Sequence, residues 1–209
     1  MTPLQTALRS ARPYPVYRQF LTNKLENEGK TTGDNQSELY LRIANLNQSR
    51  MDRLDRKHRL TEDLTTTLAS LKHNYTLLVL TEGWCGDAAQ IVPVLQWLDE
   101  ASPRVQLLCA LRDENLGLID QYLTNGGRSI PLVLFLDPNT EEVLASWGPR
   151  PLIAQAMSMH YKRKPAPKED YEEHHKELHT WYARDKTVST QYELNELFNW
   201  LEASRTVGV

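Results

Sequence analysis

Hydrophobic residues in the middle of the chain gather in short runs bounded by glycine, proline and asparagine, and segments with helical spacing separate the runs. Short apolar runs predict strands, whereas apolar positions three and four apart predict helices. In chain order, the expected elements are strand 74–81, helix 85–101, strand 105–111, helix 115–123, strand 131–136, strand 142–147 and helix 151–162. The order βαβαββα predicts an α/β domain with parallel pairing across the helices and one antiparallel hairpin at 131–147.

The flanks of this region are helical in pattern. Before it, residues 34–72 carry leucine and isoleucine at helical spacing, and Thr61 is placed to cap a helix. After it, residues 163–169 indicate a linker, and Thr190 with Glu193 forms a capping-box pattern that opens a last helix. We therefore divide the chain into an N-terminal helical extension packed on the core (1–72), the core (73–164) and a C-terminal helical extension (165–209).

Composition argues against several classes of partner. The formal charge is −3, from 24 basic and 27 acidic residues, so the chain as a whole indicates neither nucleic-acid nor membrane binding. The basic segment 50–59 has interleaved acids and no aromatic residue, which favours a solvated helix face, with one arginine reaching toward Cys85 as the alternative. Two cysteines and no secretory apolar segment indicate a reduced, cytoplasmic protein, and no pattern indicates an oligomeric state.

The strongest chemical signal is the stretch 77–93, LLVLTEGWCGDAAQIVP. An unbroken apolar strand ends at Gly83, and Cys85 then opens a helix. Free N–H groups and the helix dipole stabilise a thiolate at such a position, so we expect an exposed, nucleophilic thiol with a lowered pKa. The alternative is a cysteine packed as a small hydrophobic residue.

The motif W-C-G-D-A at 84–88 resembles W-C-G-P-C, the active-site motif of the thioredoxin superfamily. Pro93 is similar to the proline inside that family's active-site helix. Residues 128–131, RSIP, resemble the segment with its cis-proline, and residues 146–148, SWG, resemble its glycine-bearing strand end. The resemblance covers residues 74–162 and implies a thioredoxin-like α/β fold, a central mixed sheet flanked by helices, with helical additions at both ends.

Two departures from the family limit what the resemblance implies. Ala88 replaces the second cysteine of C-x-x-C, and Val79 replaces the buried aspartate that serves it. We therefore expect single-cysteine thiol–disulfide exchange without an internal disulfide. Cys85 would form a mixed disulfide, and an external thiol would resolve it.

The expected substrate is a protein or low-molecular-weight thiol or disulfide, positioned by Trp84, Ile130 and Pro131, with no cofactor and no metal. Whether the chain is an enzyme, a monothiol disulfide oxidoreductase, is left open. The alternatives are a binding or scaffold module without turnover and a redox sensor at Cys85.

Other candidate residues have two interpretations each. Asp87 is structural if it points away from the sulfur and a proton donor or acceptor if it faces it, and Arg128 would offset its charge. Cys109 is expected in the core, unbonded to Cys85. His174, His175 and His179 are placed on a solvated helix face rather than in a metal site.

Overall fold

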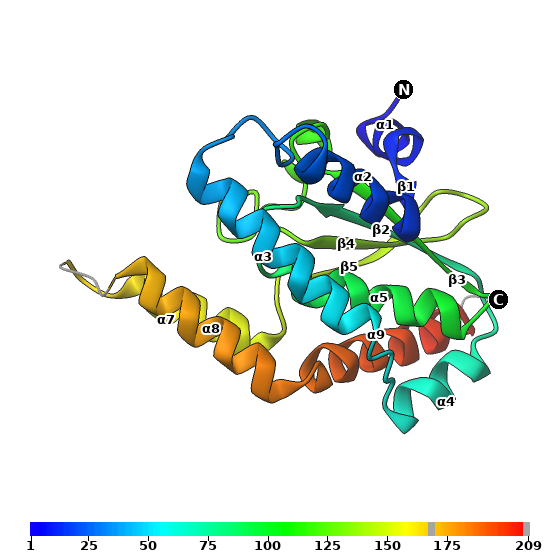
Figure 1. The fold of residues 1–209 in the computed structure, drawn as a ribbon. Helices are drawn as coiled ribbons and strands as arrows, with labels where there is room; N and C mark the ends of the chain where they lie inside the picture. The colour runs from blue at the N-terminus through cyan, green and yellow to red at the C-terminus, as the bar shows by residue number, and fades with distance from the viewer. Residues whose placement is uncertain (167–169, 207–209) are drawn as a thin grey trace.

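A five-stranded mixed sheet forms the centre of the molecule, in the order β1-β3-β2-β4-β5 (Figure 1). The structure is a computed structural model of the chain and describes residues 1–166 and 170–206. The strands are β1 (Arg12–Pro13), β2 (Tyr75–Thr81), β3 (Val105–Leu111), β4 (Leu132–Leu136) and β5 (Val143–Trp147). The α/β architecture predicted from the sequence is confirmed.

Helices surround this sheet. They are α1 (Pro3–Ser10), α2 (Tyr14–Glu26), α3 (Glu38–Asp55), α4 (Glu62–Ser70), α5 (Ala88–Ala101), α6 (Leu116–Ile119), α7 (Leu152–Arg163), α8 (Tyr171–Asp185) and α9 (Val188–Thr206). Helix α5 packs against β3, and α3 and α4 pack over α5. Helix α9 packs against α4 and reaches the sheet through Phe198, whose ring meets those of Tyr75 and Phe135 edge-on at 5.5 and 5.4 Å.

Strand direction differs from the sequence prediction at one point. β2 and β3 are parallel, as expected, and β4 and β5 form the expected antiparallel hairpin. The expected parallel pairing across the second helix is wrong, because β4 runs antiparallel to β2. Helix α6 has only four residues and does not carry the chain back along the sheet. β4 therefore starts with Leu132 beside Leu80, at the end where β2 finishes.

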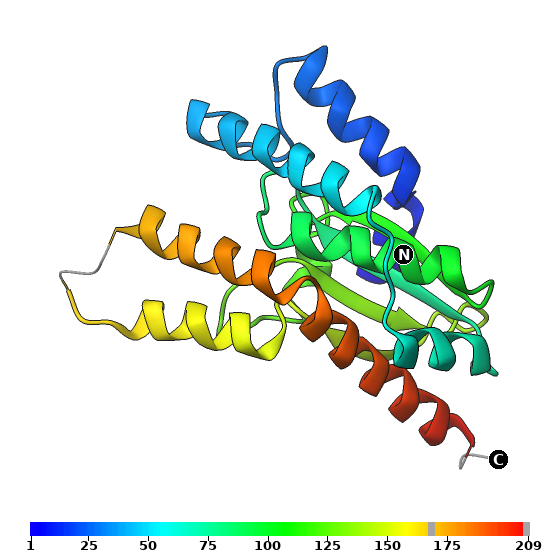
Figure 2. The same ribbon diagram turned by 60° about the horizontal axis from the view of Figure 1, so that its bottom comes forward.

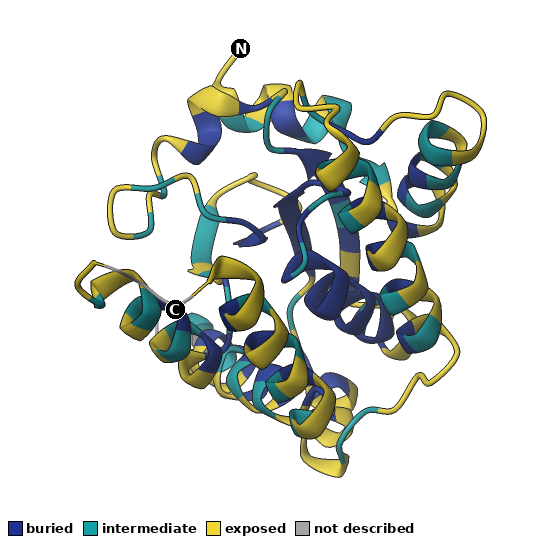
Figure 3. Ribbon diagram, turned by 60° about the vertical axis from the view of Figure 1, so that its left-hand side comes forward, coloured by how far each residue is buried: buried dark blue, intermediate teal, exposed yellow. Residues whose placement is uncertain are grey.

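The core lies between the sheet and α5. All seven residues of β2 are buried, as the unbroken apolar run predicted. Helix α5 is buried from Ala88 through Leu98, because the sheet covers one side of it and other helices cover the rest. Figure 3 shows the central strands and α5 mostly in the colour of buried residues, while β5 is of intermediate burial and the outer helices are buried along their inner sides.

The extensions confirm part of the expected pattern. Thr61 caps α4, its hydroxyl accepting from the Leu64 N–H at 3.4 Å. The predicted capping box is wrong, because α9 begins at Val188, before Thr190, and the Glu193 carboxylate instead accepts from the indole of Trp147 at 2.9 Å. The predicted linker at 163–169 lies partly outside the described residues.

Helices α7 and α8 form an antiparallel pair that projects beyond the sheet, which we call the α7–α8 hairpin (Figures 1 and 2). Ala154 of α7 packs with Leu178 and Tyr182 of α8 in a small apolar cluster of its own. Among the helices that the structure describes, none has the length and apolar character needed to span a bilayer.

Candidate functional site

Cys85 lies just before the amino end of α5, which begins at Ala88 and not at Cys85 as predicted. Its backbone N–H donates to the Glu82 carbonyl at 3.0 Å, which closes the turn after β2. Its own carbonyl accepts from the Ala89 N–H at 3.1 Å and so begins the helical hydrogen-bond pattern. The Ala88 N–H approaches the sulfur at 3.5 Å. One backbone donor at the helix start therefore faces the thiol.

The thiol also faces the segment that resembles the family's cis-proline. The Ile130–Pro131 peptide bond is cis, and Cys85 Sγ donates to the Ile130 carbonyl oxygen at 3.3 Å. Gly148 closes over this segment with φ at +117°, and a Cβ there would lie 2.3 Å from the Pro131 carbonyl oxygen. The end of β5 can therefore approach Pro131 this closely only with glycine.

The expectation of an exposed thiol with a lowered pKa is wrong for this structure. Cys85 is 7% exposed, and burial, followed by the negative charge of Asp87, raises its pKa to about 12. The Ala88 N–H and the Arg150 guanidinium act in the opposite direction but do not outweigh these two effects. The thiol is protonated here, because low-dielectric surroundings penalise the thiolate more than one helix N-terminus stabilises it.

Asp87 is held in a buried ion pair. One carboxylate oxygen lies 2.6 Å from the Arg150 guanidinium, and the other accepts from the Tyr182 hydroxyl at 2.9 Å. Both partners come from outside the predicted motif, Arg150 from the loop before α7 and Tyr182 from α8. Asp87 thus joins the loop that carries Cys85 to the α7–α8 hairpin while its charge disfavours the thiolate of Cys85.

Arg128 does not offset the charge of Asp87, contrary to expectation. Its guanidinium pairs with both carboxylate oxygens of Asp120 at 2.6 and 2.8 Å, on the surface. Arg150 takes the expected role instead. Arg150 stands between two prolines in a loop without periodicity, so no pattern in the sequence marks it.

Helix α8 covers the residue after the cysteine. A Cβ on Gly86 would lie 2.7 Å from Nε2 of His179 and 3.2 Å from Nε2 of His175, and these two nitrogens are 3.0 Å apart. Nδ1 of His179 lies 3.3 Å from the Gln90 amide of α5. Burial lowers the pKa of His175, and it lowers that of His179 to about 2.

The expected solvated histidine face is therefore wrong. His175 and His179 are half-buried, and His174 is buried, with its ring stacked on Tyr161 at 4.2 Å between centroids. No cluster of three metal-ligating side chains occurs within residues 1–166 and 170–206. The histidines serve as the inner surface of α8.

The basic segment is divided between two environments. Arg53 donates to the Gln90 carboxamide oxygen at 3.1 Å, and Arg50 donates to Asn47, which in turn bonds the Gly83 carbonyl. Burial lowers the pKa of Arg50 to about 10. Arg53 thus contacts the first turn of α5, and Arg50 is linked to the loop that carries Cys85 only through Asn47, whereas residues 55–59 are exposed as expected.

Trp84 and Cys109 complete the set of predicted residues. Trp84 is half-buried between the Tyr40 ring at 5.4 Å and the Arg112 guanidinium, 4.8 Å from the indole. Cys109 is fully buried in β3, which confirms its place in the core, and both cysteines are free thiols.

Comparisons with known proteins agree with this architecture. A family model described as thioredoxin matches residues 33–164, which takes in α3 and α4 as well as the core. A protein of unknown function from Pseudomonas aeruginosa, known from a crystal structure, has 21% identity and a TM-score of 0.53, covering 78% of this chain and 86% of that one.

An HIV epitope-scaffold has 19% identity and a TM-score of 0.51, covering 82% of this chain and 98% of that one. The curated proteins contain no match. The two solved structures share the fold, and the family model spans more than half of the sequence: the chain belongs to the thioredoxin family.

Proposed function

We propose that the protein performs monothiol thiol–disulfide exchange through Cys85. The observation that carries the proposal is the position of the sulfur, at the amino end of α5 and 3.3 Å from the Ile130 carbonyl oxygen. A substrate chain that replaces this contact would pair with the backbone at Ile130. Trp84 and Pro131 would flank the substrate's sulfur.

The chemistry needs two exchange steps. The Cys85 thiol first gives its proton to water, and the thiolate attacks one sulfur of a substrate disulfide, forming a mixed disulfide and releasing the other sulfur as a thiolate. An external thiolate then attacks the mixed disulfide at the substrate's sulfur and returns Cys85 as a thiolate. The chain has Ala88 where a resolving cysteine would stand, so the second thiol comes from solution.

Turnover requires movement of α8. A thiol that is 7% exposed and protonated cannot attack a protein disulfide while His175 and His179 lie over Gly86. Burial is the largest cause of the raised pKa of Cys85, so exposing the sulfur lowers that pKa and supplies the thiolate. Displacement of α8 would therefore expose the thiol to the substrate and at the same time lower its pKa.

The test uses glutathione disulfide as the probe and intact-mass analysis of the full chain. Gly86→Ala places a methyl group against His179 and should push α8 away, whereas Gly117→Ala is the matched control, because its Cβ meets nothing nearer than 3.7 Å. We expect an adduct on Cys85 that reduced glutathione removes, formed faster in Gly86→Ala and at the wild-type rate in Gly117→Ala. Cys85→Ser should form none.

The burial of Cys85, its raised pKa and the absence of a resolving cysteine favour a second candidate, a binding module without turnover. In that case neither the wild type nor folded Gly86→Ala forms an adduct at Cys85, and the exchange proposal is refuted. Oxidation sensing is less well supported, because it also needs a thiolate in the resting protein.

A further inference from the structure

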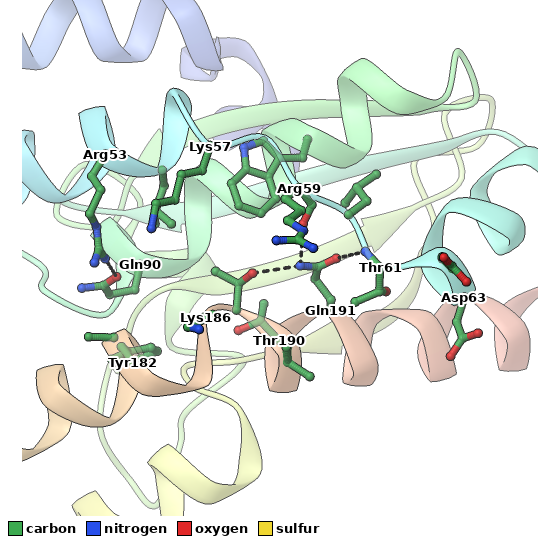
Figure 4. Close-up of a pocket in the computed structure, with 17 residues that line it drawn as sticks. Arg53, Lys57, Arg59, Thr61, Asp63, Gln90, Tyr182, Lys186, Thr190 and Gln191 are labelled. Carbon is green, nitrogen blue, oxygen red and sulfur yellow. Dashed lines mark hydrogen bonds between the residues drawn. The ribbon is translucent and has the colours of Figure 1, made fainter.

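A cavity lies apart from the thiol, between the end of α3, the loop into α4, helix α5 and the junction of α8 with α9 (Figure 4). We call it the α3–α9 pocket. Its volume is about 980 Å³, at the upper end of the range for small-molecule sites. Cys85, Asp87 and Arg150 do not line it, whereas Gln90 and Tyr182 line the pocket and also border the site at Cys85.

Four cationic side chains line this pocket: Arg53, Lys57, Arg59 and Lys186. Within the described part of the chain, the side chains of Lys57, Arg59 and Lys186 have no ion pair and no hydrogen bond, and Arg53 bonds only the neutral Gln90. Unpaired cations converge here although the chain as a whole carries −3.

The acidic residues of the pocket stand at one end. Glu62 and Asp63 belong to the first turn of α4, where they complement the helix dipole. In Figure 4, Asp63 lies at the far end of the drawn residues from Arg53 and Lys57. The cationic end of the pocket is therefore not neutralised by these carboxylates.

Specific hydrogen bonds hold the walls of the pocket in place. Gln191, 2% exposed, accepts from the Thr61 N–H at 2.7 Å and donates to the Arg59 carbonyl at 3.1 Å, so α9 holds the loop that carries Arg59 (Figure 4). Lys186 and Thr187 both adopt left-handed backbone conformations, with φ at +53° and +72°. Such a conformation is costly for a β-branched residue and is a recurrent feature of ligand-binding sites.

Two buried donors without partners point to the kind of ligand. The Nε atom of Arg53 and the indole Nε1 of Trp97 are both buried and have no hydrogen-bond partner among the described residues. Both groups can only donate, so a ligand that meets them must supply acceptors. Trp97 and Tyr182, at 3% and 5% exposed, add aromatic surface beside the cations.

We propose that the α3–α9 pocket binds a small organic polyanion through its phosphate or carboxylate groups. Arg53, Lys57, Arg59 and Lys186 would neutralise its charges, and Trp97 and Tyr182 would contact its apolar part. A solvent-accessible cavity of this volume suits a small molecule, and guanidinium groups bind phosphate and carboxylate oxygens in pairs. This proposal does not depend on the chemistry of Cys85.

Calorimetric titration of the full chain with pyrophosphate and, separately, with citrate tests the proposal and distinguishes the phosphate from the carboxylate source. We expect at least one of them to bind at low ionic strength and to weaken as salt is added. A charge-assisted hydrogen bond contributes enough that Lys57→Gln and Arg59→Gln should each weaken binding about tenfold.

The matched control is Arg56→Gln, which removes an exposed arginine on the same segment that does not line the pocket. It should leave the affinity unchanged, and thermal melting should show that all three variants are folded. The proposal is overturned if neither anion binds, or if Arg56→Gln weakens binding as much as Lys57→Gln and Arg59→Gln do.

Discussion

The charge of Asp87 should control the reactivity of Cys85, and Asp87→Asn tests this directly. The substitution keeps the size of the side chain and an oxygen to accept from the Tyr182 hydroxyl, but it removes the negative charge. That charge is the second cause, after burial, of the raised pKa of Cys85. Neutralising it leaves the Arg150 cation near the sulfur, which further favours the thiolate.

The size of the effect follows from the structure. A rise in pKa from 9.0 to about 12 leaves about a thousandfold less thiolate at pH 7 than an ordinary thiol would supply. A neighbouring charge at close range changes a pKa by about 1 to 3 units, and burial remains in the variant. Because Asp87 is the smaller of the two causes of the raised pKa, we take a change of about 1 to 2 units and expect Asp87→Asn to raise the thiolate population at pH 7 by about ten- to a hundredfold.

Alkylation by iodoacetamide measures this population, since the thiolate is the reacting form. Rates at Cys85 would be followed by mass spectrometry from pH 6 upward, with Cys85→Ser reporting any reaction at Cys109. Arg128→Gln is the matched control, because it removes a charge that pairs with Asp120 and not with Asp87. It should alkylate at the wild-type rate.

Two results would refute the reasoning. The first is a wild-type rate that levels off with an apparent pKa below the roughly 8.5 of free cysteine, which would mean that the thiol is not masked. The second is an Asp87→Asn variant, folded by thermal melting, whose rate at pH 7 equals that of the wild type. Either result would show that burial and the charge of Asp87 do not control the pKa of the Cys85 thiol.

Three further predictions concern stability. Tyr182→Phe should cost about 1 to 3 kcal/mol in urea unfolding, because a buried carboxylate loses a donor, while Tyr192→Phe, at an exposed tyrosine of α9, should cost nothing measurable. Phe198→Ala should cost about 3 to 5 kcal/mol by the same measurement, since its fully buried ring joins α9 to the sheet, and a cost below 1 kcal/mol would contradict that role. Burial raises the pKa of Glu82 from 4.5 to about 7, so the folded state binds more protons than the unfolded state between these values. The free energy of unfolding should therefore fall by about 3 kcal/mol as the pH rises from 4.5 to 7, and a Glu82→Gln variant that keeps the full decrease would disprove the assignment.

The position of Cys85 could be predicted from sequence because local features determine it. An unbroken apolar run made β2 a covered strand, Gly83 ended it, and the residues after Cys85 contain no helix breaker until Pro93, which α5 accommodates. Each of these signals lies within a few residues of the structure it specifies.

The burial of Cys85 could not be predicted in this way. Tyr182 bonds Asp87 across 95 residues, and the histidines of α8 stand among glutamates and lysines that suggest a solvated surface. Whether a helix end stabilises a thiolate depends on what covers it, and that is decided by long-range packing. The direction of β4 was predicted wrongly for a related reason. It depends on how far α6 carries the chain along the sheet, which long-range packing decides.

The carboxamide of Gln90 connects the α3–α9 pocket with the site at Cys85. Gln90 accepts from Arg53, which lines the α3–α9 pocket, and its amide meets His179, which lies over Gly86 beside the thiol. If an anion draws Arg53 away from Gln90, the contact between Gln90 of α5 and His179 of α8 changes as well. Thermodynamic linkage then makes the effect reciprocal. The factor by which a bound anion changes the affinity of the Cys85 site for its substrate equals the factor by which a bound substrate changes the affinity of the pocket for the anion.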